Sequence, residues 1–123
     1  MNKCRFYKFF FLVCGTNINN QRTALIMIIH IALFRWKEGT EKESIEKALK
    51  QVKQLKNKCD GIIDIFCGEN FHKESKGLTH GVVIIAKNQD SLDGYRKHSE
   101  HKVIAKNIEI IEDDGLGFDF EDL

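Results

Sequence analysis

The sequence of 123 residues lacks an excess of charge of either sign, since 19 basic side chains face 18 acidic ones and the formal net charge is +1. Proteins that bind nucleic acid or an anionic membrane through their surface charge need a clear basic excess. We therefore expect neither partner. The sequence also contains no internal repeat and no low-complexity segment.

Cysteine is scarce, and its four positions, 4, 14, 59 and 67, lack the spacing of a metal site or a redox motif. There is no C-x-x-C pair, and no zinc-finger pattern of histidines accompanies the cysteines. We therefore expect a protein of the cytoplasm with reduced thiols and no structural zinc. A disulfide between Cys59 and Cys67 would require export of the chain.

Residues 1–26 differ from the remainder, because all of their charged residues, Lys3, Arg5, Lys8 and Arg22, are basic. The apolar stretch 9–13 is far too short to span a bilayer, which takes about 20 residues. No A-x-A-like cleavage site follows it. We expect an N-terminal extension that the fold does not need. Three explanations stay open: a degenerate signal peptide, which would imply export, a disordered extension, or a misassigned start ahead of Met27.

The chain of 123 residues has the length and composition of one domain, which we place at residues 27–123, since 42% of the chain is hydrophobic and nine of its residues are phenylalanine. Alternating apolar residues predict strands at 27–36, 62–68, 78–87 and 108–112, with 118–120 extending the sheet. Helical spacing predicts a helix from a capping box at Thr40–Glu43 to about Lys58. A second helical region, capped by Asn88 or Asp90, is predicted to break near Ser99 and to run to about Lys106.

This order of elements, βαββαβ, predicts an α+β, ferredoxin-like sheet with its helices on one face. We expect the uncovered face to display apolar side chains together with His30 and His80. An apolar face of this size is seldom left in water, so we expect a second copy of the chain to cover it.

Histidine and tyrosine have an unusual arrangement near position 100. Tyr95, His98 and His101 are each three residues apart, so a helical turn would bring a phenol and two imidazoles near one another. Such a cluster is either a small acid–base site or a polar network that fixes the helix on the sheet. His80, His98 and His101 could also hold a divalent transition metal. No acidic residue at matching spacing completes that set, so we expect no metal.

The segments Met27–Phe34, Gly68–Asn70 and Thr79-His80, followed by Tyr95-x-x-His98-x-x-His101, resemble the stress-responsive dimeric α+β barrel family. The resemblance covers Met27 to about Phe120. It implies a ferredoxin-like protomer whose sheet packs face to face against that of a second copy. It also implies a cavity between the sheet and the helices of each subunit.

One characterised type within this family, the plant olivetolic acid cyclase, promotes an intramolecular aldol condensation of a polyketide. The resemblance places its tyrosine and histidine acid–base pair at Tyr95 and His101, and two other pocket histidines at His30 and His80. Two positions depart from the pattern. Val52 stands where that cyclase has a pocket tyrosine, and Ser99 stands where the family usually has a proline. The cyclase substrate is therefore not carried over.

We expect Ser99 to cap the final helix, which would place His101 in the first turn, where the helix dipole disfavours imidazolium. A neutral His101 would then act as general base, and the Tyr95 phenol would hold the oxygen on which charge develops. The side chains expected to contact the ligand are His30, His80, Phe34, Trp36, Val52 and His98.

The prediction from sequence is thus a homodimeric barrel protein that binds a small apolar carbonyl compound. If it is an enzyme, we expect cyclase-like or lyase-like acid–base chemistry without an organic cofactor. Two alternatives stay open: a non-enzymatic stress protein whose stable dimer is itself the product of selection, and a cofactor-free monooxygenase of the same architecture.

Overall fold

The computed structural model describes residues 26–123. Apart from Ile26, the extension predicted for residues 1–26 lies outside the described residues, as do the first two cysteines. The elements of the described part are β1 (Ile28–Trp36), α2 (Lys42–Gln54), a short 3-10 turn (Leu55–Asn57), β2 (Ile62–Glu69), β3 (His80–Ala86), α3 (Gln89–Lys97), α4 (Ser99–Ile111) and β4 (Glu112–Glu121).

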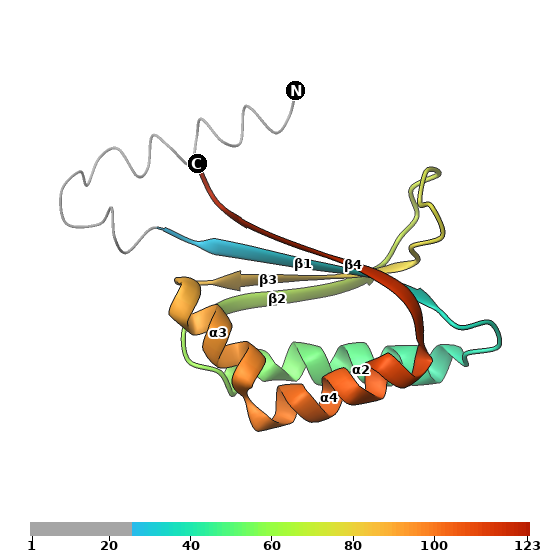
Figure 1. The fold of residues 1–123 in the computed structure, drawn as a ribbon, viewed down its shortest axis with the longest axis horizontal. Helices are drawn as coiled ribbons and strands as arrows, with labels where there is room; N and C mark the ends of the chain where they lie inside the picture. The colour runs from blue at the N-terminus through green and yellow to red at the C-terminus, as the bar shows by residue number, and fades with distance from the viewer. Residues whose placement is uncertain (1–25) are drawn as a thin grey trace.

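The four strands of the described part form one antiparallel sheet in the order β2-β3-β1-β4. All three helices pack on the same side of this sheet, whereas the loop between β2 and β3 rises on the other side (Figure 1). This arrangement is the predicted ferredoxin-like βαββαβ fold.

Strand alternation decides which side chains the helices cover. The helix-facing residues Ile65, Val82 and Ile84 are almost fully buried, together with Leu92 of α3. These side chains form the core with the apolar stripe of α2, namely Ile45, Ala48, Leu49 and Val52.

The opposite face of the sheet, which we call the open face, is apolar and uncovered. Ile31 pairs with Val83 on one side and with Phe118 on the other, so the three side chains lie in one row. Phe66, Leu116 and Phe118 are each more than half exposed. Within residues 26–123, no element of the protein packs over them (Figure 1).

The predicted capping box at Thr40–Glu43 is wrong. Helix α2 begins at Lys42, and its N-cap residue Glu41 makes no side-chain capping bond. The Thr40 hydroxyl instead donates to the Lys37 carbonyl at 2.6 Å and closes the turn around Gly39, whose φ is +82°. The local turn therefore competes successfully for the hydroxyl that the helix end was expected to use.

The strand predicted at 108–112 is also wrong, because Ile108 to Ile111 form the last turn of α4 and β4 begins at Glu112. Ile104 and Ile108 lie four residues apart and are both buried. Helical packing of these two side chains outweighs the weak strand preference of a β-branched run. The predicted extension at 118–120 lies in β4, and the predicted cap at Asn88 accepts from the Ser91 amide.

His30 and His80 do not lie on the open face, which corrects a third expectation. His30 pairs with the buried Ile84, and His80 lies two residues before the buried Val82 in β3. Both imidazoles therefore belong to the helix-facing side of the sheet. Period-two alternation with the core residues of the same strands requires this placement.

Candidate functional site

A cavity of about 210 Å³ lies between the helix-facing side of the sheet and α4. Pockets for drug-sized ligands hold roughly 300–1,000 Å³, so this one suits a smaller compound. Its walls are mainly apolar and include the predicted Phe34 and Val52. The polar side chains that line it are His30, Tyr95, His101, Glu109 and Glu112.

The Tyr95 and His101 rings meet although they come from different helices. Helix α3 ends at Lys97, and α4 begins at Ser99. His98 between them has an extended backbone, with φ of −59° and ψ of 134°. The chain therefore turns at this residue, and the centroids of the two rings lie 4.5 Å apart.

His101 is held in one tautomer. Its Nδ1 lies 3.1 Å from the Arg96 carbonyl oxygen, which only accepts, so Nδ1 carries the proton. Burial lowers the pKa of His101, and the electrostatic interactions with His30, Arg96 and His98 act in the same direction. The bond to the Arg96 carbonyl opposes this effect only in part. The ring is therefore neutral at pH 7, and Nε2 is free to accept a proton.

Tyr95 is 3% exposed, and its hydroxyl has no hydrogen-bond partner among the described residues. Burial raises the pKa of Tyr95 well above its ordinary value, and the nearby thiols of Cys67 and Cys59 add to this. The phenol is therefore protonated and can donate a hydrogen bond to a group in the cavity.

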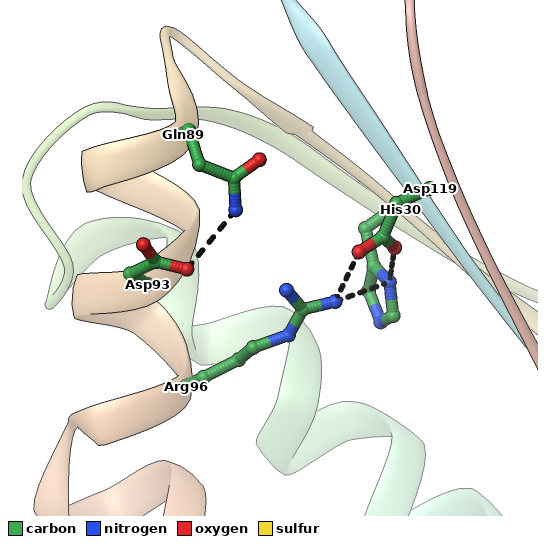
Figure 2. Close-up of polar contacts among 5 residues, drawn as sticks. All are labelled: His30, Gln89, Asp93, Arg96 and Asp119. Atoms are coloured by element: carbon green, nitrogen blue, oxygen red, sulfur yellow. Dashed lines mark hydrogen bonds and ion pairs between the residues drawn. The ribbon is translucent and has the colours of Figure 1, made fainter.

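His30 belongs to a polar cluster that the sequence did not reveal. Asp119 of β4 lies opposite His30 of β1 in the sheet register, and its carboxylate accepts from His30 Nδ1 at 2.5 Å. Arg96 reaches from α3 to the same carboxylate at 2.6 Å (Figure 2). Burial disfavours the ionised Asp119, but the bonds from Arg96 and His30 outweigh it and lower the pKa of Asp119. The proton on Nδ1 leaves Nε2 as the remaining nitrogen of His30.

His80 and Trp36 do not line this cavity but lie next to it. Trp36 stacks on the cavity residue Phe34 with ring centroids 5.1 Å apart, and its indole N–H donates to His80 Nδ1 at 2.9 Å. Burial lowers the pKa of His80, which keeps Nδ1 available as an acceptor. These two side chains therefore support the cavity wall rather than face its interior.

His98 lies at the junction of α3 and α4 and does not line this cavity. Its Nδ1 accepts from the Glu100 amide at 3.2 Å, so His98, and not Ser99, is the N-cap of α4. His101 nevertheless lies in the first turn of α4, as expected. The structure thus brings together Tyr95 and His101 but turns the third ring of the motif away to the helix end.

No group of three or more histidine, cysteine or acidic side chains suited to a metal ion occurs within residues 26–123. His80, His98 and His101, the set considered from sequence, have separate partners. Cys59 and Cys67 are free thiols, and burial raises the pKa of Cys67 to about 11. No helix in the described range has the length and apolarity that crossing a membrane requires.

Sequence reasoning missed Asp119, Arg96, Glu109 and Glu112. For Asp119 a signal existed, because an acidic residue between Phe118 and Phe120 in a strand must face the opposite side from both rings. No comparable signal marks Arg96, whose contacts depend on how α3 sits over the sheet.

The comparisons with known proteins support the fold. A hydroxynitrile lyase from Passiflora edulis is 13% identical, with a TM-score of 0.74 over 80% of this chain and 95% of its own. A dimeric ferredoxin-like protein of unknown function from Thermobifida fusca is 21% identical, with a TM-score of 0.69 over 77% and 90%. A Dabb family protein from Mesorhizobium loti is 16% identical, with a TM-score of 0.68 over 80% and 98%.

The comparison with curated proteins finds no match. The family of the stress responsive A/B barrel domain, abbreviated Dabb, matches residues 28–122. This range holds every described strand and helix, as well as the cavity and the cluster around His30. The chain therefore belongs to the stress responsive A/B barrel domain family.

Proposed function

We propose that the cavity binds a small carbonyl compound and that His101 and Tyr95 move a proton on it. The observation that carries this proposal is the pair of rings inside the cavity, 4.5 Å apart, one with a free basic nitrogen and one with an unpartnered hydroxyl. Such a pair can serve as general base and oxyanion donor.

The proton transfer balances within this pair and the substrate. His101 Nε2 removes a proton from the carbon next to the carbonyl, and the electron pair moves to the carbonyl oxygen. The Tyr95 hydroxyl donates a hydrogen bond to that oxygen. The imidazolium then returns a proton to carbon, which restores both side chains.

A structural neighbour of this fold is a hydroxynitrile lyase, which is in keeping with catalysis on this architecture. At 13% identity the likeness concerns the fold alone, so the proposed substrate class rests on the cavity and not on that protein.

Exchange of the methyl protons of acetophenone for deuterium, followed by NMR in heavy water, tests the proposal directly. We expect the protein to accelerate exchange and His101→Gln to remove about 100-fold or more of that acceleration, the usual contribution of a general base. Tyr95→Phe should cost about 10²-fold or more. His72→Gln, which changes an exposed loop histidine, is the matched control and should leave the rate unchanged. Equal rates for His101→Gln and His72→Gln would contradict the proposal.

We further propose that a second copy of the chain covers the open face. The row that contains Phe66, Leu116 and Phe118 is too apolar to be left in water. A hollow of about 510 Å³ between this face and the loop after β2 offers room for side chains of the second copy. The neighbour from Thermobifida fusca is described as dimeric.

A further inference from the structure

The cavity has a second polar region, formed by Glu109 near the end of α4 and Glu112 at the start of β4. Glu109 follows His101 by eight residues on one helix, which separates their backbones by about 12 Å. The carboxylates and the acid–base pair therefore belong to opposite ends of the cavity, with apolar walls between them.

The backbone places Glu112 on the cavity side by an irregularity in the sheet. Arg35 pairs with Asp114, but the next residue, Trp36, pairs with Glu112, so Asp113 forms a bulge between them. A bulge of this kind shifts the side-chain alternation by one position. Glu112 thereby faces the helices together with Trp36, whereas Asp113 and Asp114 form ion pairs with Arg35 at 2.8 and 3.5 Å.

Gly115 leaves the space that the Glu112 carboxylate uses. A Cβ atom at Gly115 would lie 2.1 Å from Glu112 Oε1 and 3.0 Å from the Leu33 carbonyl oxygen. The first of these contacts is impossible, so any other residue at 115 would force the carboxylate to move. The position of the Glu112 carboxylate at this end of the cavity thus depends on Gly115.

Neither Glu109 nor Glu112 has an ion pair or a side-chain hydrogen bond with another described residue. Burial raises the pKa of Glu112, and the negative charges of Asp114 and Glu109 add to the effect. Glu112 is half-buried and Glu109 is exposed, so the nearby negative charge of Glu109 disfavours ionised Glu112, and a positive group between the two would favour it. At the other end of the cavity, the phenol of Tyr95 is 3% exposed and also lacks a partner. The cavity therefore presents two carboxylates without a positive partner among the described residues at one end, and a phenol that can donate a hydrogen bond at the other.

We propose that the ligand of this cavity carries a positively charged amine at the end away from its carbonyl group. The amine would lie between Glu109 and Glu112, and the carbonyl oxygen would accept from Tyr95. This inference rests on the proposed function for the carbonyl end, but the charge preference has a test of its own.

Two ketones of the same size provide that test: para-(aminomethyl)acetophenone, which is cationic at pH 7, and para-ethylacetophenone, which is neutral. We expect NMR titration of the full chain to show at least tenfold tighter binding of the cationic ketone. The double variant Glu109→Gln/Glu112→Gln should reduce this preference to less than twofold. The double variant Glu74→Gln/Glu121→Gln, which removes the same charge from exposed positions, should retain it.

Equal affinity for the two ketones, or tighter binding of the neutral one, would overturn the inference. A preference that survives in Glu109→Gln/Glu112→Gln would overturn it as well. Deuterium exchange on both ketones separates the two proposals. A charge preference without exchange would leave the amine site in place and defeat the acid–base function. Exchange on both ketones with equal affinity would support the acid–base function and defeat the amine site.

Discussion

The two faces of the sheet are built from the same strands but differ in every property that bears on function. Residues of one parity meet the helices and include polar groups, such as the half-buried His30 and the exposed Asp119, that are hydrogen-bonded to each other. Residues of the other parity, such as Phe118, are apolar and stand exposed. Polar side chains gathered beside a cavity indicate a site, whereas an exposed apolar row indicates an interface.

The difference also shows how one strand can serve two purposes. In β4, Phe118 and Phe120 face outward, whereas Asp119 between them faces the helices. Because the side-chain period of a strand is two, selection on one face leaves the other free to vary. Substitutions that change one face at a time test this difference.

The largest expected effect comes from neighbouring residues of β2. Ile65 is 0% exposed, so Ile65→Ala should lower the free energy of unfolding by about 2–5 kcal/mol. Phe66→Ala on the open face should cost less than about 1 kcal/mol at concentrations where the chain is monomeric. Urea unfolding measures both. Similar losses for the two variants would show that the open face is part of the monomer's core.

Next in size is the effect of a charge on the open face. Phe118→Asp should weaken self-association by about 2 kcal/mol or more, which is roughly 30-fold. Analytical ultracentrifugation over a range of concentrations measures this change. Val103→Asp, at an exposed apolar position of α4, is the control and should leave association unchanged. An unchanged dissociation constant of the dimer in Phe118→Asp would place the interface elsewhere.

A smaller effect concerns His80 of the sheet and His101 of helix α4. Burial lowers the pKa values of His80 and His101 in the folded protein, so the unfolded chain binds protons more readily. Stability should therefore fall as the pH drops below about 6.5, by less than about 1 kcal/mol for each ring because both are partly exposed. Urea midpoints between pH 8 and 5 measure the slope. His101→Gln should flatten it, whereas His72→Gln should not.

The smallest effect is expected for Arg96→Gln. The folded pKa of Asp119 lies below its unfolded value, so this carboxylate stabilises the protein above pH 4 and ceases to do so as the pH falls through the folded pKa. The variant should cost less than about 1 kcal/mol at pH 7, since the pair is partly exposed, and less at about pH 2 because Asp119 becomes protonated as the pH falls. Lys97→Gln is the matched control. An equal cost at both pH values would mean that Arg96 acts through packing.

The fold could be predicted from the sequence because its strands and helices have clear apolar periods. The alternation in β1 and β3 and the helical spacing of Ile45, Leu49 and Val52 are local signals. The capping box at Thr40–Glu43 was wrong because a local turn takes the Thr40 hydroxyl, whereas the strand at 108–112 was wrong because tertiary contacts decide there. Ile108–Ile111 reads equally well as a strand, and only packing against the sheet makes it helical.

The candidate site could be predicted in part. The resemblance indicated Tyr95 and His101, and the structure brings their rings together in a cavity. The ligand roles expected for His80, Trp36 and His98 stay predictions, and these three side chains do not line that cavity. His30 donates to Asp119 of β4, 89 residues away, and the same carboxylate accepts from Arg96 of α3, which is 66 residues from His30. Pairs so distant in sequence leave no periodic trace in a single chain.

The extended backbone at His98 sets the geometry of the acid–base pair. In one uninterrupted helix, positions 95 and 101 would be rotated by about 240° from each other and would project to different sides. Because a single ψ angle of 134° joins α3 to α4, the rings converge instead. The length of this junction therefore determines how the two rings meet. An inserted residue there would uncouple the two rings while every side chain of the pair was still present.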